Sequence, residues 1–250
     1  MKIVACVKRV PTTDLKPQVG GDGKSLDPSG IQYEVSFYDE RAVEEAVQQK
    51  EKHGGDVTVL TLGSASGTKE IRSCLAKGAD DAICLVDEDW GSRDSLSTAK
   101  ALAAKIKDLG ADLVLTGRVA TDRDNAAVGP MIATLLGYAC VTDVVELSID
   151  GTSGTAKRES EAGIETYSFS LPAVITCQKD LNEPRHAGMK GIMAAKKKPL
   201  AEEAHAAPDN TSTVNSLAMP PERPEGRIIG EGPDAIPALI DALRNEAKAL

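Results

Sequence analysis

Residues 95–117 read SLSTAKALAAKIKDLGADLVLTG, and this stretch decides the fold class. Its first part carries apolar residues at helical spacing, namely Leu96, Ala99, Ala103 and Ile106. Gly110 is a typical helix stop, and the apolar run at 112–116 that follows it predicts a buried strand. A helix that leads at once into a buried strand is one unit of a parallel sheet covered by helices.

The same alternation continues on both sides of this unit. We expect strands at 2–10, 57–62, 82–86, 141–147 and 173–177, and helices that begin at Asp39, which would be the N-cap, and span 69–77 and 125–136. Turn residues at 150–154 and 161–163 predict a β-hairpin. The predicted fold is α/β, a doubly wound and mostly parallel sheet with a β-hairpin excursion and an extended C-terminal arm.

The chain divides into two parts near residue 200. Residues 1–199 would form the α/β domain, and residues 200–250 an arm, because 200–232 are rich in Pro, Ala and Asn with little periodicity. The arm ends in an amphipathic helix with one apolar stripe of Ile236, Leu239, Ile240, Leu243 and Ala247. That stripe could pack on a partner subunit or return to its own domain.

Composition excludes several classes of protein. Aromatic residues make up only 3 % of the chain, so the core must be aliphatic, and a net charge of −9 disfavours general binding to nucleic acid. No apolar run approaches the roughly 20 residues of a membrane span, and no signal peptide follows Met1, so we expect a cytosolic protein. The five cysteines are odd in number and lie far apart, which predicts reduced core thiols.

The loop within residues 115–130 is the first candidate site. It leaves a buried strand and opens a helix, where free backbone N–H groups can bind an anion. Small residues at 125–127 would let a phosphate approach the backbone, and Arg118 and Arg123 could supply positive charge. An ordinary βα loop with a solvated tip is the alternative.

The end of the first strand, with Cys6, would border the same crevice as residues 36–39, and the two could clasp a mononucleotide. Cys6 could equally be a core residue, and Tyr38 and Asp39 a helix-capping turn.

Residues 180–198 form a third candidate site. An Asn-Glu-Pro-Arg turn precedes apolar Met189, Ile192 and Met193 and then three lysines, as in an exposed anchor for protein partners. The alternative is that these apolar residues are core and that the lysines are a solvated face.

We predict neither a metal site nor a catalytic residue. His186 has no ligand partner at a usable spacing, no nucleophile constellation is present, and Glu44 and Glu45 are expected on a solvated helix face.

Together these segments resemble the β subunit of electron transfer flavoprotein over essentially the whole chain. The matching pieces are VACVKRVP, AVEEAVQQKEK, IRSCLAKGADDA, DLVLTGRVATDRDNAAVGP, LPAVITCQKDLNEPR and GIMAAKKK. The resemblance implies an adenine nucleotide α-hydrolase-like fold and a heterodimer with an α subunit, on which residues 200–250 would pack. It also implies an FAD shared with that subunit, and electron transfer from acyl-CoA-type dehydrogenases to a quinone oxidoreductase or other acceptor, without catalytic residues of its own.

The resemblance also places the family's functional residues on this chain. Its nucleotide site falls on Cys6, Ser36, Phe37, Tyr38, Asp39, Leu62, Gly63, Gly117, Arg118, Val119, Ala120, Thr121, Asp122, Arg123, Asp124, Asn125, Ala126, Ala127, Val128 and Gly129. Its recognition loop falls on residues 182–198, which we term the docking segment. There the partner-docking residues would be Asn182, Glu183, Pro184, Arg185, Met189, Ile192, Met193, Lys196, Lys197 and Lys198, with Met189 as the anchor.

Two branches of the family differ in the ligand of that site, which is AMP in one and a second FAD used for bifurcation with NAD(H) in the other. Arg118 and Asp39 look closer to the second branch. Ser36-Phe37 stands where Asn-Pro is usual, and Arg123 and Ala127 replace a Gly and a Gln of the bifurcating pattern. The sequence therefore does not decide between AMP and a second FAD. A stand-alone ATP- or AMP-binding protein of the universal-stress kind also remains an alternative.

Overall fold

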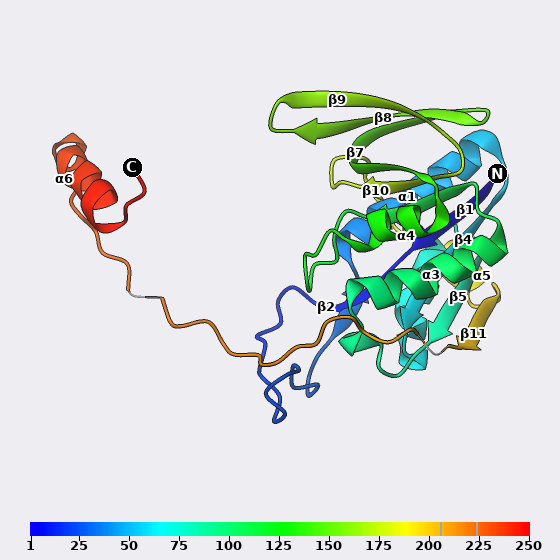
Figure 1. Cartoon of the computed structure of the whole chain (residues 1–250), viewed down its shortest axis with the longest axis horizontal. Coiled ribbons are helices and arrows are strands. Elements are labelled where there is room, and N and C mark those ends of the chain that lie inside the picture. The colour runs from blue at the N-terminus through cyan, green and yellow to red at the C-terminus, as the bar shows by residue number, and fades with distance from the viewer. Residues whose placement is uncertain (206, 224) are drawn as a thin grey trace.

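The computed structural model describes residues 1–205, 207–223 and 225–250, so Ala206 and Pro224 of the predicted arm lie outside the described residues. A nine-stranded sheet organises the chain, in the order β11-β5-β4-β1-β6-β10-β7-β8-β9 (Figure 1). The strands of its parallel part are β1 (Lys2–Cys6), β4 (Asp56–Gly63), β5 (Asp81–Val86), β6 (Leu113–Gly117), β7 (Ala139–Asp150), β10 (Ala173–Cys177) and β11 (Leu200–Ala204). This confirms the expected doubly wound, mostly parallel α/β fold.

Helices cover both faces of the parallel strands. One face packs on α1 (Phe37–His53) and α2 (Thr68–Lys77), the other on α3 (Ser95–Leu109) and α4 (Val128–Leu136). Alternate residues of β1 enter the two cores, because Ile3 and Ala5 face α1 whereas Val4 and Cys6 face α3. Strands buried on both sides must be apolar throughout, which explains the near-continuous apolar runs of the sequence.

The hairpin excursion is also present. Strand β7 continues antiparallel into β8 (Ser153–Ser160) and β9 (Gly163–Ser170), which extend the sheet at one edge (Figure 1). The turns fall at the predicted glycines, since Gly151 and Gly163 both have positive φ.

Several predicted elements differ in the structure. The predicted strand at 2–10 breaks after Cys6, and residues 9–11 form a separate strand, β2 (Arg9–Pro11), antiparallel to β3 (Tyr33–Val35). Helix α1 begins two residues before Asp39, with Ser36 as its N-cap, so the predicted cap was wrong. Helix α4 begins at Val128 rather than at residue 125.

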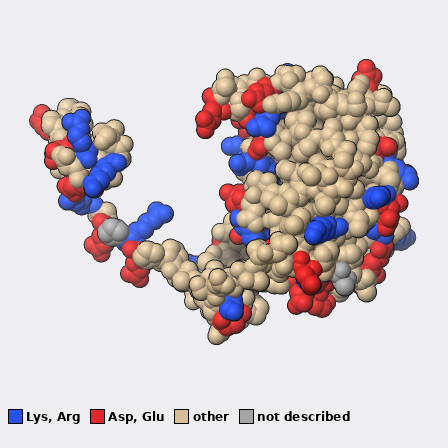
Figure 2. Space-filling model, viewed as in Figure 1, with Lys and Arg blue, Asp and Glu red and all other residues tan. Residues whose placement is uncertain are grey.

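The predicted arm begins as part of the sheet, because β11 pairs in parallel with β5 at its edge. Beyond residue 217 the arm leaves the body and ends in the short helices η3 (Pro233–Ala235), α6 (Ile236–Asp241) and η4 (Ala242–Glu246), with open space between this end and the body (Figure 2). The apolar stripe of Ile236, Leu239 and Ile240 is exposed there. No helix within the described ranges is long and apolar enough to cross a bilayer.

Candidate functional site

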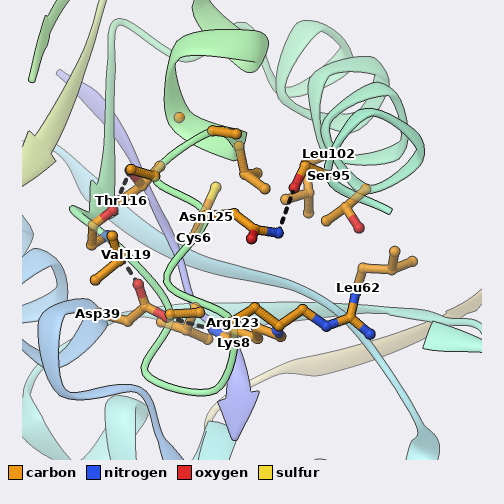
Figure 3. Close-up of a pocket in the computed structure, with 18 of the residues that line it drawn as sticks. Cys6, Lys8, Asp39, Leu62, Ser95, Leu102, Thr116, Val119, Arg123 and Asn125 are labelled. Carbon is orange, nitrogen blue, oxygen red and sulfur yellow. Dashed lines mark hydrogen bonds between the residues drawn. The ribbon is translucent and has the colours of Figure 1, made fainter. Parts of the chain in front are cut away.

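A pocket opens at the point where the chain reverses its progress across the sheet. From β1 the chain adds β4 and β5 on one side and then returns to add β6 on the other. The carboxyl ends of β1 and β6 therefore flank a crevice, the place where open α/β sheets bind ligands. The crevice holds about 870 Å³ of empty space, part of it open to solvent (Figure 3). We term it the switch-point pocket.

Asp39 joins the two strands at the floor of this pocket. Its carboxylate accepts the backbone N–H of Lys8 at 2.7 Å and that of Gly117 at 2.9 Å. The side chain is buried, and burial raises the pKa of Asp39 to about 7, although the two N–H donors pull the pKa down. Asp39 thus fixes the spacing of the βα turns that follow β1 and β6.

The loop between β6 and α4 has an unusual backbone. Asp124 and Ala126 have φ of 52° and 51°, a left-handed conformation that costs free energy in residues other than glycine. Ala127 returns to the right-handed region. A left-handed residue followed by a right-handed one aims successive N–H groups at one point, an arrangement typical of anion-binding loops. The N–H groups of residues 125–127 have no hydrogen-bond partner among the described residues.

Gly129 brings this loop close to the sheet. A Cβ at Gly129 would lie 2.7 Å from Cγ2 of Thr176 and 2.8 Å from Oγ1 of Thr116. The first turn of α4 can therefore pack on β6 and β10 only because this position has no side chain.

The basic side chains around the pocket have fixed partners. Lys8 Nζ lies 2.6 Å from Asp122 Oδ2, and Arg118 Nε lies 2.5 Å from Asp143 Oδ1. Arg123 instead donates to two neutral groups, the carbonyls of Gly91 and Arg93. Its positive charge is therefore not neutralised by these partners, and its side chain extends across the pocket between Lys8 and Leu62 (Figure 3).

Asp143 reaches Arg118 because β7 is irregular at this point. The pairing of β7 with β10 shifts register between Ile175 and Cys177, and Asp143 adopts a positive φ of 58°. A bulge of this kind re-aims a side chain. Sequence reasoning did not predict this contact.

Thirteen of the twenty residues expected at the nucleotide site line this pocket. They are Cys6, Asp39, Leu62, Gly117, Arg118, Val119, Ala120, Arg123, Asn125, Ala126, Ala127, Val128 and Gly129. The remaining seven do not line it, namely Ser36, Phe37, Tyr38, Gly63, Thr121, Asp122 and Asp124. Ser36 instead supports the loop from behind, since its buried Oγ accepts the N–H of Thr121 at 3.3 Å.

One wall of the pocket was missed. It comes from the segment after β5 and the start of α3, and consists of Trp90, Arg93, Ser95, Thr98 and Leu102. Asn125 joins this wall to the loop by donating to Ser95 Oγ at 3.2 Å. The available signal was positional, because the carboxyl end of β5 opens at the same edge of the sheet.

The docking segment lies away from the pocket, beside α1 and α2. It contains a short helix, α5 (Met189–Ala195), in which Met189 is 79 % and Met193 is 60 % exposed. Lys196 and Lys197 are exposed as well. Lys198 is not a solvated charge, because its Nζ donates to the carbonyls of Leu75 and Ala79.

Glu44 and Glu45 were wrongly expected on a solvated face, since both are only 3 % exposed. They face the docking segment, where Arg185 and Asn182 cover them.

Four of the five cysteines are buried, whereas Cys140 is exposed. Burial raises the pKa of the Cys6 and Cys177 thiols. Within the described residues, no group of three or more His, Cys, Asp or Glu side chains could hold a metal ion.

Comparisons with known proteins point in one direction. A family model described as "Electron transfer flavoprotein domain" matches residues 25–208. The chain is 35 % identical to the electron transfer flavoprotein subunit beta of Bacillus subtilis over the full length of both, and 38 % identical to that of Syntrophomonas wolfei over 99 % of this chain and 98 % of the relative. It is also 37 % identical to the caffeyl-CoA reductase-Etf complex subunit CarD of Acetobacterium woodii, over 80 % of this chain and 77 % of the relative.

Proposed function

This chain belongs to the electron transfer flavoprotein β-subunit family, and from that premise we propose that it pairs with an α subunit to carry electrons. The electrons would pass from acyl-CoA-type flavin dehydrogenases to a quinone oxidoreductase or another acceptor. The observation that carries the proposal is the switch-point pocket, whose strained loop and free N–H groups suit the phosphate of a nucleotide.

The pocket of this chain would hold AMP as a structural ligand. The N–H groups of residues 125–127 would bind its phosphate, and Arg123 would add a positive charge. Arg123 also supports the smaller ligand, because its side chain is tied to the opposite wall and narrows the pocket. Cys6 and Leu62 supply apolar surface for a base.

FAD, shared with the α subunit, would supply the electron-carrying chemistry when bound. This chain would contribute no acid or base to that chemistry. Its residues would bury the nucleotide, cover one side of the flavin and present the docking segment to partners. The rate of electron transfer would then depend on how closely partners approach and on the charges set around the flavin.

The exposed end of the arm would pack on the α subunit. Ile236, Leu239 and Ile240 are exposed on one helix, and an apolar stripe of this kind is typical of a helix that meets a partner. No hydrogen bond joins residues 218–250 to the body in the described part of the chain, so the arm is available to reach a second subunit.

A cofactor count tests the proposal directly. The chain is co-purified with its α subunit, the cofactors are released by denaturation, and FAD and AMP are quantified per heterodimer. One FAD with one AMP is the expected result. Absence of both flavin and an α partner would overturn the proposal and favour a stand-alone nucleotide-binding protein.

A second candidate is a bifurcating subunit that binds a second FAD and uses NAD(H). The observation that favours it is the position of Arg118 and Asp39 on the pocket lining, since the bifurcating branch resembles this chain at those residues. Two FAD and no AMP per heterodimer would select this candidate, and reduction by NADH would then be measured.

Docking is tested by changing the exposed anchor. Met189→Ala should raise the KM of a partner dehydrogenase for the flavoprotein, because Met189 makes little contact with its own chain. The exposed Lys196 and Lys197 should steer an acidic partner, so the association rate should fall as salt rises. An unchanged KM in Met189→Ala would remove the docking assignment.

A further inference from the structure

The docking segment is held at both of its ends by buried or half-buried polar contacts. At its start, Arg185 lies against α1, and at its end Lys198 lies against α2. Between these ends, α5 presents Met189, Ile192 and Met193 to solvent. The docking segment is therefore attached to α1 at its start and to α2 at its end.

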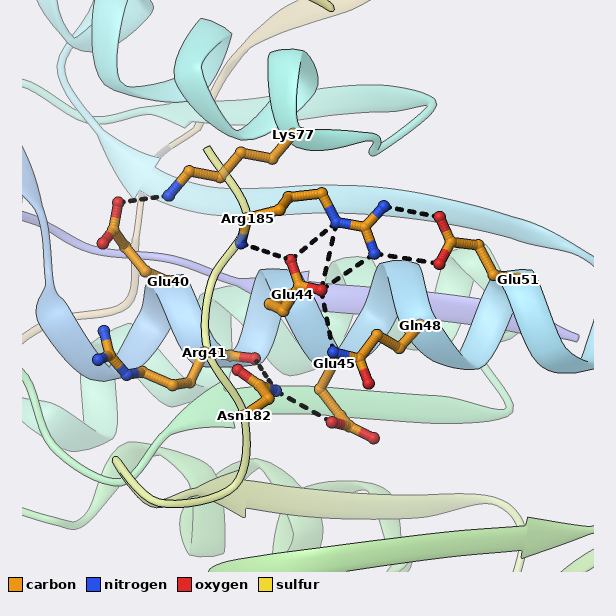
Figure 4. A network of polar contacts seen from close by, with 9 residues as sticks. All are labelled: Glu40, Arg41, Glu44, Glu45, Gln48, Glu51, Lys77, Asn182 and Arg185. Atoms are coloured by element: carbon orange, nitrogen blue, oxygen red, sulfur yellow. Dashed lines mark hydrogen bonds and ion pairs between the residues drawn. The ribbon is translucent and has the colours of Figure 1, made fainter. Parts of the chain in front are cut away.

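Arg185 makes the attachment at the start of the segment. Its guanidinium bridges two acids that lie about two turns apart on α1, with Nε 2.9 Å from Glu44 Oε2 and Nη1 2.6 Å from Glu51 Oε1 (Figure 4). Its Nη2 donates to the second oxygen of each acid at 3.0 Å, and its backbone N–H donates to Glu44 at 3.0 Å. Bidentate contacts of this kind fix direction as well as distance.

Asn182 adds a second attachment three residues earlier. Its Nδ2 donates to the carbonyl of Arg41 at 3.1 Å and to Glu45 Oε2 at 3.0 Å (Figure 4). Glu44 and Glu45 are almost fully buried, so loss of Arg185 would leave the Glu44 carboxylate without its cation, and loss of Asn182 would leave Glu45 Oε2 without its donor. Displacement of the docking segment from α1 would therefore destabilise these two buried acids.

The far end is tied to the C-terminus of α2. Arg72 donates to the carbonyls of Ala195 and Lys198 at 2.6 Å each, and Lys198 returns a bond to the carbonyl of Leu75 at 3.0 Å. A Cβ at Gly191 would lie 2.4 Å from the carbonyl oxygen of Ala76, so α5 rests directly on α2.

Helix α5 cannot hold this position by itself. It spans Met189–Ala195, which is far shorter than an isolated helix needs in water. Its two methionine side chains, Met189 and Met193, are mostly exposed, and only Ala195 at its C-terminal end is buried. The orientation of the exposed residues therefore depends on the contact of α5 with α2 and on the attachments at the two ends of the segment.

We propose that Arg185 is a positioning residue for partner docking: its bridge to Glu44 and Glu51 pre-orders the docking segment, so that a partner does not have to order it on binding. This inference rests on the proposed function of the docking segment. Pre-ordering a segment improves affinity by reducing the ordering cost of association. The bridge lies outside the switch-point pocket, since none of Glu44, Glu51 and Arg185 lines it.

The test uses the purified heterodimer with three variants of α1 and the docking segment. Arg185→Lys keeps the charge but cannot bridge both acids, and Glu51→Gln weakens the outer half of the bridge. Glu40→Gln is the matched control, because Glu40 lies on the same helix as Glu44 and Glu51 but pairs with Lys77 of α2 and does not contact residues 182–185. Amide hydrogen exchange in residues 186–195 should accelerate about tenfold in Arg185→Lys and less in Glu51→Gln, and stay unchanged in Glu40→Gln.

Steady-state kinetics separate positioning from general stability. With the flavoprotein as the varied acceptor of an acyl-CoA dehydrogenase, Arg185→Lys should raise KM roughly fivefold or more at unchanged kcat and flavin content. An unchanged KM in Arg185→Lys, together with a raised KM in Met189→Ala, would overturn the positioning role and keep the docking site. An unchanged KM in Met189→Ala would instead remove the docking function itself, and faster exchange in Arg185→Lys would then show a structural bridge without a docking role.

Discussion

The Oδ1 atom of Asp39 accepts the backbone N–H of Gly117 at 2.9 Å, and a Cβ placed on Gly117 would lie 2.4 Å from that same oxygen. The contact joins the start of α1 to the end of β6. The other oxygen of the same carboxylate, Oδ2, accepts the backbone N–H of Lys8, which follows the end of β1. One carboxylate thereby fixes the spacing of the two strands that flank the pocket. It can approach β6 this closely only because residue 117 has no side chain.

Substitution of Gly117 should therefore disturb the floor of the pocket. Gly117→Ala forces a Cβ against Asp39 and against Cβ of Tyr38, 2.8 Å away, and should cost about 1–3 kcal/mol of unfolding free energy. Urea-induced unfolding measures the change. Gly91→Ala is the matched control, because a Cβ there meets nothing within 4 Å, and it should change stability by less than about 0.5 kcal/mol. Equal stability of the two variants would contradict the close approach.

The raised pKa of Asp39 predicts a pH dependence of stability. Burial lifts the pKa from the ordinary 3.8 to about 7, so the folded protein binds this proton more tightly than the unfolded chain does. The stability that this provides is complete below pH 3.8 and is lost as pH rises through about 7.

Asp39→Asn removes the titration. The difference in unfolding free energy between the wild type and this variant should fall between pH 4 and 7 and become constant at higher pH. Chemical denaturation at a series of pH values measures it. A difference that stays flat across this range would mean that Asp39 titrates normally.

Local signals in the sequence account for both ends of α3, of which the stop at Gly110 was predicted. Asp94 accepts the N–H of Ser97 as a cap, and Gly110 ends the helix with φ of 63°, so both boundaries are set by neighbouring residues. The start of α4 was not predictable in this way. Ala126 has a left-handed backbone that nothing in its type demands, and the surrounding loop imposes it.

Contacts between distant segments account for the other differences. Glu44 and Glu45 are buried because Arg185 and Asn182, which lie 141 and 137 residues further along the chain, cover them. The charged strand β11 exists because β5 offers a free edge. No periodicity within either segment could have indicated these partners.

Asp94 should also hold the arm beside the pocket. Its Oδ1 caps α3, and its Oδ2 accepts the backbone N–H groups of Thr211 and Ser212 at 2.5 and 2.9 Å. The N–H of Ser97 has the largest effect on the pKa of Asp94, and together with the N–H groups of Thr211 and Ser212 it holds that pKa far below its usual range. Its contribution is therefore present above pH 3.8 and is lost as pH falls further.

The two roles of Asp94 can be separated by substitution. Asp94→Asn should retain the helix cap but weaken the arm contact, whereas Asp94→Ala should also lose about 1 kcal/mol of cap stabilisation. Limited proteolysis should cut after residue 212 faster in both variants, and urea unfolding should distinguish them. Asp89→Asn serves as the control, since Asp89 is exposed and lies 3.9 Å from its ion-pair partner Arg93. Unaltered proteolysis in both Asp94 variants would argue against the arm contact.

Arg123 should decide the size of ligand that the switch-point pocket accepts. Its guanidinium is fixed to the carbonyls of Gly91 and Arg93, so the side chain closes space that a larger nucleotide would need. In the heterodimer, Arg123→Gly should lower the AMP content and let a larger dinucleotide such as FAD enter, whereas Arg123→Met keeps the bulk but loses both bonds and the charge. AMP and FAD per heterodimer are counted after denaturation. If bulk alone sets the size, Arg123→Met will exclude FAD as the wild type does; if the fixed position is needed, it will admit FAD like Arg123→Gly. AMP content unchanged in both variants would show that Arg123 neither limits the pocket nor binds the phosphate.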